Sequence, residues 1–204
     1  MRSDGDEHPP PPRREGRLAR LRQAPATAAL LATIVVVFVA STAYPSLAFR
    51  FAKDSQRVRA GELWRLVTAN FLHGSVLHLL VNGWALYVIG PAVEHLYGRL
   101  RFIVVFVLGG AVGFAASTVF VPQPSLGASA GLFAFLGVLL AFSLRAGNRI
   151  PRAARRAMTR EILTVAALNL ALGFMVPFID NAAHLGGFAA GFAMGLVLRP
   201  RGAP

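Results

Sequence analysis

The sequence predicts an all-α membrane protein with six transmembrane helices. Hydrophobic residues make up 55% of the 204 residues, charged residues make up 15%, and the mean hydropathy is +0.55. A soluble domain carries about 25% charged residues because it must cover its own surface, whereas lipid covers a membrane protein. The apolar residues also gather in six stretches, each close to the roughly 20 residues that cross a bilayer as a helix.

These apolar stretches and the polar breaks between them define the expected organisation. We expect spans at about 25–44, 74–93, 102–121, 127–145, 161–178 and 181–198, which together form one domain over residues 24–200. Residues 1–23 are polar, with a run of prolines followed by arginines, so they predict a disordered basic tail. The first stretch follows a basic region, as a signal peptide does, but its apolar core is long for that role.

The arginines predict the orientation in the membrane. They gather in the tail, between the fourth and fifth stretches and at the end of the chain: Arg2, Arg13, Arg14, Arg17, Arg20, Arg22, Arg145, Arg149, Arg152, Arg155, Arg156, Arg160, Arg199 and Arg201. Connections rich in arginine stay in the cytoplasm, so we expect both termini there. The first connection, residues 45–73, also holds five cationic residues, but it is long and weighs less in this rule.

The net charge of +12 raises the question of a nucleic-acid partner. The arginines bunch at the ends of apolar runs and do not form a stripe through a folded domain, so we expect no nucleic-acid binding. The chain has no cysteine, which excludes disulfides, thiolate metal sites and a cysteine nucleophile.

Six polar side chains fall within or beside the apolar stretches, where their cost in lipid makes each a functional candidate. They are His73, His78, Asn82, Ser129, Asn169 and His184. The second, fourth and sixth stretches all enter the membrane from the outer side, and all of these residues except Asn169 lie near that entry. Residues scattered for packing have little reason to share a depth. The topology therefore predicts one polar site near the outer face, and we interpret Asn169 as a helix-packing residue.

Ser129 is the candidate nucleophile. It lies in the segment Gly127-Ala128-Ser129-Ala130-Gly131, at the expected start of the fourth helix. A serine hydroxyl needs a base within hydrogen-bond reach, and the free N–H groups of a helix N-terminus favour the negative charge of an oxyanion. Taken alone, the pattern is equally typical of a contact between helices through small residues.

His184 is the candidate base, and small residues explain how it reaches the serine. One face of the sixth helix carries glycines at a spacing of four: Gly187, Gly191 and Gly195. The fourth helix also has an expected small face: Gly127, Gly131 and Ala134. If these faces pack together, Ser129 and His184 meet near the starts of their helices. A lone histidine in such a place is a packing residue, but its pairing with a serine at equal depth favours catalysis.

His78 and Asn82 are four residues apart and share one helix face, where their side chains can donate to an oxyanion or link helices. Other protease classes fit poorly. No glutamate follows a histidine in the H-E-x-x-H pattern of zinc enzymes, and His95 lies at the opposite end of its helix. Asp180 is the expected N-cap of the sixth helix, so we favour a Ser-His dyad over a triad.

These residues resemble the signatures of rhomboid intramembrane serine proteases. The resemblance rests on three motifs in the order and on the helices expected: His73-x4-His78-x3-Asn82, Gly127-Ala128-Ser129-Ala130-Gly131, and Ala183-His184-x-Gly186-Gly187-x3-Gly191. Trp64-Arg65 resembles the Trp-Arg pair of the family's first loop, and Glu94 resembles an acidic residue at the end of its second helix. The likeness covers about residues 60–195.

The resemblance implies a fold and a mechanism. It implies a Ser129-His184 dyad, an oxyanion hole formed by His78, Asn82 and the Ser129 amide, and supporting roles for the motif glycines Gly127 and Gly131 and for His73. It also implies a first loop lying partly in the membrane and anchored by Trp64-Arg65. Substrates would be single-span membrane proteins cut near the outer face, and no cofactor or metal is implied.

One position departs from much of the family. Phe133 stands where many members have a tyrosine against the histidine ring, so the stacking face is kept and the hydroxyl is lost. Six helices match the minimal bacterial form, which implies the bacterial plasma (inner) membrane. An inactive relative that binds client transmembrane helices is the alternative function. A small transporter fits less well, because the polar residues do not reach the midplane.

Overall fold

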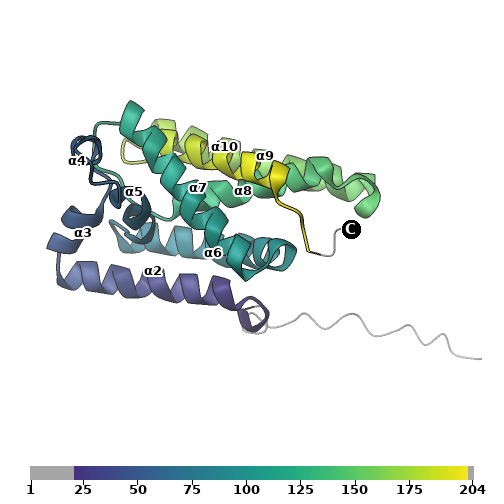
Figure 1. Cartoon of the computed structure of the whole chain (residues 1–204), viewed down its shortest axis with the longest axis horizontal. Helices are drawn as coiled ribbons and strands as arrows, with labels where there is room; N and C mark the ends of the chain where they lie inside the picture. The colour runs from purple at the N-terminus through teal and green to yellow at the C-terminus, as the bar shows by residue number, and fades with distance from the viewer. Residues whose placement is uncertain (1–20, 202–204) are drawn as a thin grey trace, which may run out of the picture.

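The structure is a computed structural model that describes residues 21–201, and it is an all-α bundle (Figure 1). Six long helices coincide with the six predicted stretches: α2 (Pro25–Ala43), α6 (Val76–Tyr97), α7 (Arg99–Phe120), α8 (Ser129–Arg145), α9 (Arg152–Met175) and α10 (Asn181–Val197). The described part of the chain contains no β-strand, only an isolated bridge between Lys53 and Ser125. The all-α prediction is confirmed. Residues 1–20 of the predicted tail lie outside the described residues, and residues 21–23 are helical.

Within residues 21–201, four helices are long and apolar enough to cross a bilayer on their own: α2, α6, α7 and α9. The other two, α8 and α10, have 17 residues each, which is about 25 Å at the helical rise of about 1.5 Å per residue. The helix α8 lies in the middle of the bundle, whereas α10 packs on α8 and α7 and has five of its 17 residues buried. In α8, 13 of the 17 residues are buried, and α7, α9, α10 and α6 all pack on it.

The bounds of α9 differ from the expected span. The helix begins at Arg152, whereas we expected the span to begin near residue 161, and it ends at Met175 instead of 178. The extension contains arginine and alanine, which favour helix, so a stretch that reads as a polar break is helical. Pro151 immediately precedes the helix, a place where proline is tolerated because the first N–H groups of a helix have no partner within it.

The bundle has two distinct ends (Figure 1). The loop end carries the short helices of the first connection: α3 (Ser46–Phe51), α4 (Ser55–Arg59), α5 (Arg65–Thr68) and the 3-10 turn η1 (Ala69–Phe71). The terminal end holds both ends of the described chain. There the Arg201 amide donates to Leu96 O over 2.8 Å, and the His95 ring lies 3.1 Å from Gln23 O. The Arg-rich connection between α8 and α9, which contains the turn η2 (Gly147–Arg149), also lies at the terminal end.

Small residues bring α8 and α10 into backbone contact. A Cβ placed on Gly187 would overlap Ala130 O, and one on Gly191 would overlap Ala134 O. At Gly195 the added carbon would lie 2.6 Å from Ala141 Cβ. The predicted glycine face of α10 is therefore confirmed as the packing face.

The predicted face of α8 is wrong in two of its three residues. Ala134 does face α10, but Gly131 faces α7, where an added Cβ would lie 2.6 Å from the Phe106 ring. Gly127 precedes the helix and faces His78. The α8 residues that meet the glycines of α10 are Ala130, Ala134, Val138 and Ala141, so Ala130 takes the place expected for Gly131.

Cations of the first connection bind backbone carbonyls. Arg65 is buried and donates to Glu62 Oε2 at 2.6 Å, Ala52 O at 2.8 Å and Phe49 O at 3.2 Å. Lys53 Nζ donates to Val121 O at 2.6 Å and to Gln123 O at 3.0 Å. These carbonyls follow the C-terminal end of α7, where the helix dipole favours positive charge. The first connection is thereby tied to α7.

Glu94 joins α2 to α6 at the terminal end. Its carboxylate accepts from Ala26 N at 2.9 Å, from Thr27 N at 2.7 Å and from Thr27 Oγ1 at 2.9 Å. The first N–H groups of a helix have no partner within that helix, so a residue of α6 caps α2 across the interface. Gly90 allows this approach, since a Cβ there would lie 2.7 Å from Thr27 Cγ2.

Candidate active site

Ser129 and His184 form a hydrogen-bonded pair at the loop end of the bundle. The distance from His184 Nε2 to Ser129 Oγ is 2.8 Å. Ser129 is the first residue of α8, and His184 lies in the first turn of α10, with its side chain buried. The pair forms because the two helices touch at Ala130, which follows Ser129, and at Gly187, which lies one turn after His184. At this distance the imidazole nitrogen and the serine hydroxyl share one hydrogen bond.

The approach to Ser129 requires glycine at position 127. Gly127 has a φ of +131°, a conformation that other residues rarely adopt. Its amide donates to Ala69 O at 2.9 Å, and a Cβ there would lie 2.7 Å from His78 Nε2. The same glycine therefore turns the chain into α8 and leaves room for the His78 ring.

Phe133 holds the ring of His184. The two rings are stacked, with centroids 4.3 Å apart and planes 9° apart. Phe133 lies one turn after Ser129 on the same face of α8, so one helix supplies both the hydroxyl and the surface against which the imidazole lies. The stacking face expected at this position is present.

The Asp180 carboxylate hydrogen-bonds groups other than the His184 ring. It is the N-cap of α10, as predicted, and accepts from Ala183 N at 2.9 Å. Its other oxygen accepts from the Ser117 hydroxyl. Within residues 21–201, no group hydrogen-bonds His184 Nδ1. The arrangement is a pair of residues without a third, acidic member.

His78 and Asn82 lie on the cavity that contains the pair. This cavity has a volume of about 170 Å³, and Ser129 and His184 also line it. The Asn82 amide donates one of its two N–H groups to His78 O at 3.0 Å, which leaves the second to face a ligand. Together with the Ser129 amide at the helix start, these residues place several donors near one hydroxyl.

The ring of His73 packs against the ring of His78. The two rings meet edge to face, with centroids 5.1 Å apart. His73 is buried, its ring nitrogens have no hydrogen-bond partner in the part of the chain that the structure describes, and burial lowers its pKa to about 4. It is therefore neutral near pH 7 and acts as a packing surface.

Some expected site residues lie away from the cavity, and one residue joins it unexpectedly. Trp64, Arg65 and Gly131 are not among the residues that line it, whereas Asn169 is. The Asn169 side chain is exposed and its amide donates to Val165 O at 2.8 Å. The packing role expected for Asn169 is wrong, because α9 turns this residue toward the cavity. The sequence feature that could have indicated this position is the presence of a polar residue within an apolar stretch.

Among residues 21–201, no three histidine or carboxylate side chains gather closely enough to hold a metal ion. The site combines a half-buried serine, a buried histidine and hydrogen-bond donors in a membrane-embedded, multi-pass helical protein.

The chain is thus a helical membrane protein with a Ser-His pair between α8 and α10. The sequence model described as Rhomboid domain matches residues 60–201, so the chain belongs to the rhomboid family. It is 41% identical over 141 residues to Rhomboid protease GluP of Bacillus subtilis, covering 69% of this chain and 27% of that protein.

Relatives also occur in plants. RHOMBOID-like protein 5 of Arabidopsis thaliana is 36% identical over 162 residues, which cover 77% of this chain and 52% of that protein. Inactive RHOMBOID-like protein 8 of the same plant is 36% identical over 128 residues, 62% of this chain and 36% of that protein. The chain thus matches between 27% and 52% of the length of these relatives.

Proposed function

We propose that this protein is an intramembrane serine endopeptidase in which Ser129 is the nucleophile and His184 the general base. The observation that carries the proposal is the 2.8 Å contact between His184 Nε2 and Ser129 Oγ inside a cavity of the helix bundle. A histidine this close takes the hydroxyl proton as the oxygen attacks.

The reaction proceeds in two halves. Ser129 Oγ attacks the carbonyl carbon of the scissile peptide and its proton passes to His184 Nε2, which gives a tetrahedral oxyanion. His184 then donates that proton to the leaving nitrogen, the C–N bond breaks, and an ester to Ser129 remains. Water attacks this ester, with its proton taken by His184, and the acid product leaves as Ser129 recovers its proton.

The oxyanion is stabilised by donors already in place. The Ser129 amide lies at the start of α8, where the helix dipole favours negative charge. The His78 ring and the free N–H of Asn82 reach the same cavity. Donors aimed at developing charge in a site that excludes bulk water contribute much of the rate of acyl transfer.

Single-span membrane proteins are the proposed substrates. The cavity is bounded by five helices of the membrane domain, and the apolar side chains of Val81, Val165 and Leu172 line it. A transmembrane helix must unwind before its backbone reaches Ser129, and unwound backbone is tolerated only where protein or a wet cavity meets its polar groups.

The site is proposed to face the outer side of the bacterial plasma membrane, with both termini in the cytoplasm. The arginines of the α8–α9 connection and of the chain end lie at the terminal end, opposite Ser129. Those of the first connection count less as topology signals, since Arg65 and Arg59 donate to backbone carbonyls. Exposed Phe49, Leu63 and Trp64 fit a first connection lying partly in lipid.

Cleavage by the purified full chain tests the proposal. The protein is reconstituted in liposomes with a fluorescent single-span substrate, beside S129A and H184A. Either substitution should lower the rate by at least about a thousandfold, because nucleophile and base act as a unit. S143A is the matched control, since Ser143 is a buried serine at the other end of α8. Equal cleavage by all four proteins would overturn the assignment.

A fluorophosphonate probe separates an enzyme from a non-catalytic, client-binding relative. Wild type and S143A should become labelled, and S129A should not. Failure of wild type to react in liposomes and in several detergents would favour the binding protein, a type of function consistent with the inactive plant relative.

A further inference from the structure

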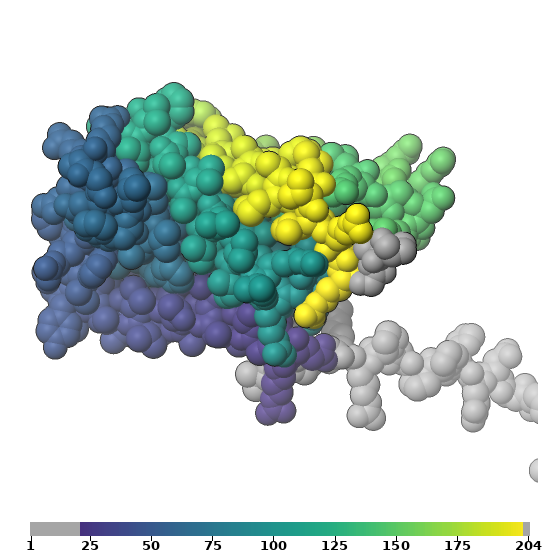
Figure 2. Space-filling model, viewed as in Figure 1, coloured from purple at the N-terminus to yellow at the C-terminus, as the bar shows by residue number. Residues whose placement is uncertain are grey.

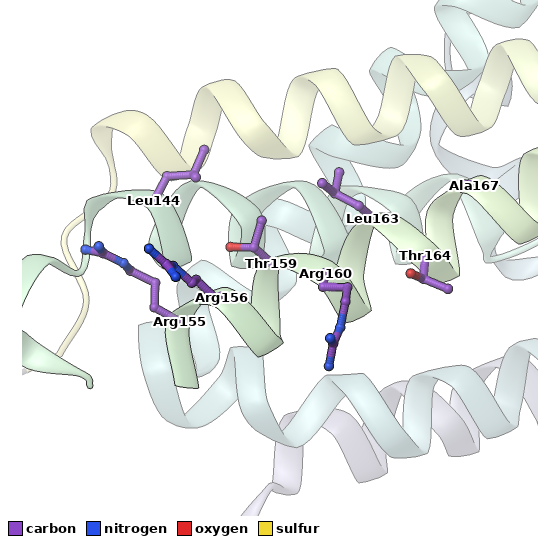
Figure 3. Close-up of a pocket in the computed structure, with 8 residues that line it drawn as sticks. All are labelled: Leu144, Arg155, Arg156, Thr159, Arg160, Leu163, Thr164 and Ala167. Atoms are coloured by element: carbon purple, nitrogen blue, oxygen red, sulfur yellow. The ribbon is translucent and has the colours of Figure 1, made fainter. Parts of the chain in front are cut away.

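A second hollow lies at the terminal end of the bundle, away from the serine. It is a groove of about 710 Å³ between the end of α8 and the first half of α9. Figure 3 shows the residues that line it: Leu144, Arg155, Arg156, Thr159, Arg160, Leu163, Thr164 and Ala167. None of these residues lines the cavity of Ser129, so the groove requires a separate explanation.

The polar part of the groove is strongly cationic. It contains three arginines and no carboxylate. Arg155 donates to Gly147 O at 3.3 Å, whereas Arg156 and Arg160 are exposed and form no ion pair within the described residues. These two lie four residues apart on α9, a spacing at which like charges repel. An anion between the guanidinium groups would relieve that repulsion and meet several N–H donors.

The rest of the groove is apolar and runs along a membrane-spanning helix. Leu163 and Ala167 continue from the arginines toward the middle of α9, and Leu144 forms the opposing wall on α8 (Figure 3). α9 is long and apolar enough to cross the bilayer. Figure 2 shows the first turns of α9, in green, projecting beyond the neighbouring helices at this end. The groove therefore leads from the membrane surface into the hydrocarbon layer.

We propose that this groove binds an anionic glycerophospholipid. The lipid phosphate lies between the guanidinium groups of Arg156 and Arg160, and an acyl chain follows Leu163 and Ala167. Basic pockets beside transmembrane helices on the cytoplasmic side select such headgroups, and guanidinium groups bind phosphate with two parallel hydrogen bonds. A soluble phosphate matches the charge but leaves the apolar wall uncovered. The proposal does not rest on protease activity.

The bound lipid adds contacts to a sparsely packed helix. Ile162 and Ala166 are the only buried residues of α9, all of which the structure describes. The same helix contributes Val165 and Asn169 to the cavity of the Ser-His pair. A lipid that bridges Leu144 of α8 and Leu163 of α9 therefore stabilises the docking of α9, and lipid binding should raise the melting temperature.

Binding is measured by native mass spectrometry of the full chain in a neutral detergent. Phosphatidylglycerol and phosphatidylcholine with identical acyl chains are the probes. The R156Q/R160Q variant should bind phosphatidylglycerol about thirtyfold more weakly than wild type. That change corresponds to about 2 kcal/mol at about 1.4 kcal/mol per tenfold, as expected for two arginines near an anionic surface. The R149Q/R152Q variant removes the same charge from neighbouring positions outside the groove and should change affinity less than about threefold.

A lysine variant and a thermal-unfolding measurement give two further tests of the lipid site. R156K/R160K keeps the positive charges but lacks the planar guanidinium groups. Its affinity for phosphatidylglycerol should therefore fall between those of wild type and R156Q/R160Q. Phosphatidylglycerol should raise the melting temperature of wild type and R149Q/R152Q but not of R156Q/R160Q. Equal loss in both glutamine variants, equal binding of phosphatidylcholine, or equal protection by glycerol 3-phosphate would overturn the lipid site.

Discussion

The contact between α8 and α10 allows a sharp test in which one methyl group is added at Gly191. A Cβ there would overlap the Ala134 carbonyl oxygen and lie 2.5 Å from Ala134 Cα and 2.6 Å from its carbonyl carbon. All three are backbone atoms that no rotamer change can move away. Because ordinary contacts of a Cβ begin near 3.4 Å, the helices must separate by about 1 Å, which strains a well-packed core.

The magnitude follows from this displacement. Adding a carbon to a packed core costs about 1–3 kcal/mol, and the contact at Gly191 is with backbone, so we expect G191A to lie at the upper end. The same shift moves His184 away from Ser129, whose present separation is 2.8 Å. A misplacement of about 1 Å lowers catalysis by about a hundredfold.

G83A is the matched control. Gly83 also lies within a helix, but a Cβ there meets only Leu31 Cδ2 at 3.8 Å, an ordinary contact. Alanine favours helix over glycine by about 1 kcal/mol, so G83A should be as stable as wild type or more so. Thermal unfolding and substrate cleavage are measured side by side in the same detergent. If G191A matches G83A in both, the close contact of α8 and α10 does not position the pair.

Three further predictions concern single side chains. E94Q weakens the cap on Thr27 and should lower the free energy of unfolding by about 1 kcal/mol, measured by thermal unfolding. The control E161Q, on the exposed face of α9, should leave the stability unchanged. Equal losses in the two variants would contradict the capping role of Glu94. Burial lowers the pKa of His73 to about 4, so the stability due to its neutral ring is present above pH 6.5 and is lost as pH falls toward 4; H73L should melt with a weaker pH dependence over that interval, and unchanged dependence would argue against this origin. D180N keeps an N-cap and should cleave substrate within about threefold of wild type, whereas the loss of about 10⁴ expected for the acid of a triad would exclude a dyad.

The positions of the helices were predictable because hydropathy is a local property. Each of the six expected spans coincides with a helix, since any stretch of about 20 apolar residues must satisfy its backbone within itself in lipid. The start of α9 at Arg152 was not predictable in this way. Hydropathy predicts where the chain leaves the apolar layer of the membrane. The helix α9 extends beyond that point because the residues there have a high helix propensity.

The contact face of α8 illustrates the opposite case. A helix that is apolar all round has no preferred face, and 13 of the 17 residues of α8 are buried. Its small residues are therefore compatible with several rotations about the helix axis. Packing against Phe106 of α7 and Gly191 of α10 selects one of them, and that choice turns Gly131 away from α10.

The chain's own pattern of residues was enough to predict the helical class, the shared depth of its polar side chains, and Ser129 and His184 as the pair to consider. Depth follows from counting along a helix, which needs no knowledge of its neighbours. The distance between Ser129 and His184, the partners of Asp180 and the exposure of Asn169 to the cavity depend on how each helix is rotated and how closely it approaches the next. These are contacts between segments far apart in the chain, so they are settled only when the whole bundle packs.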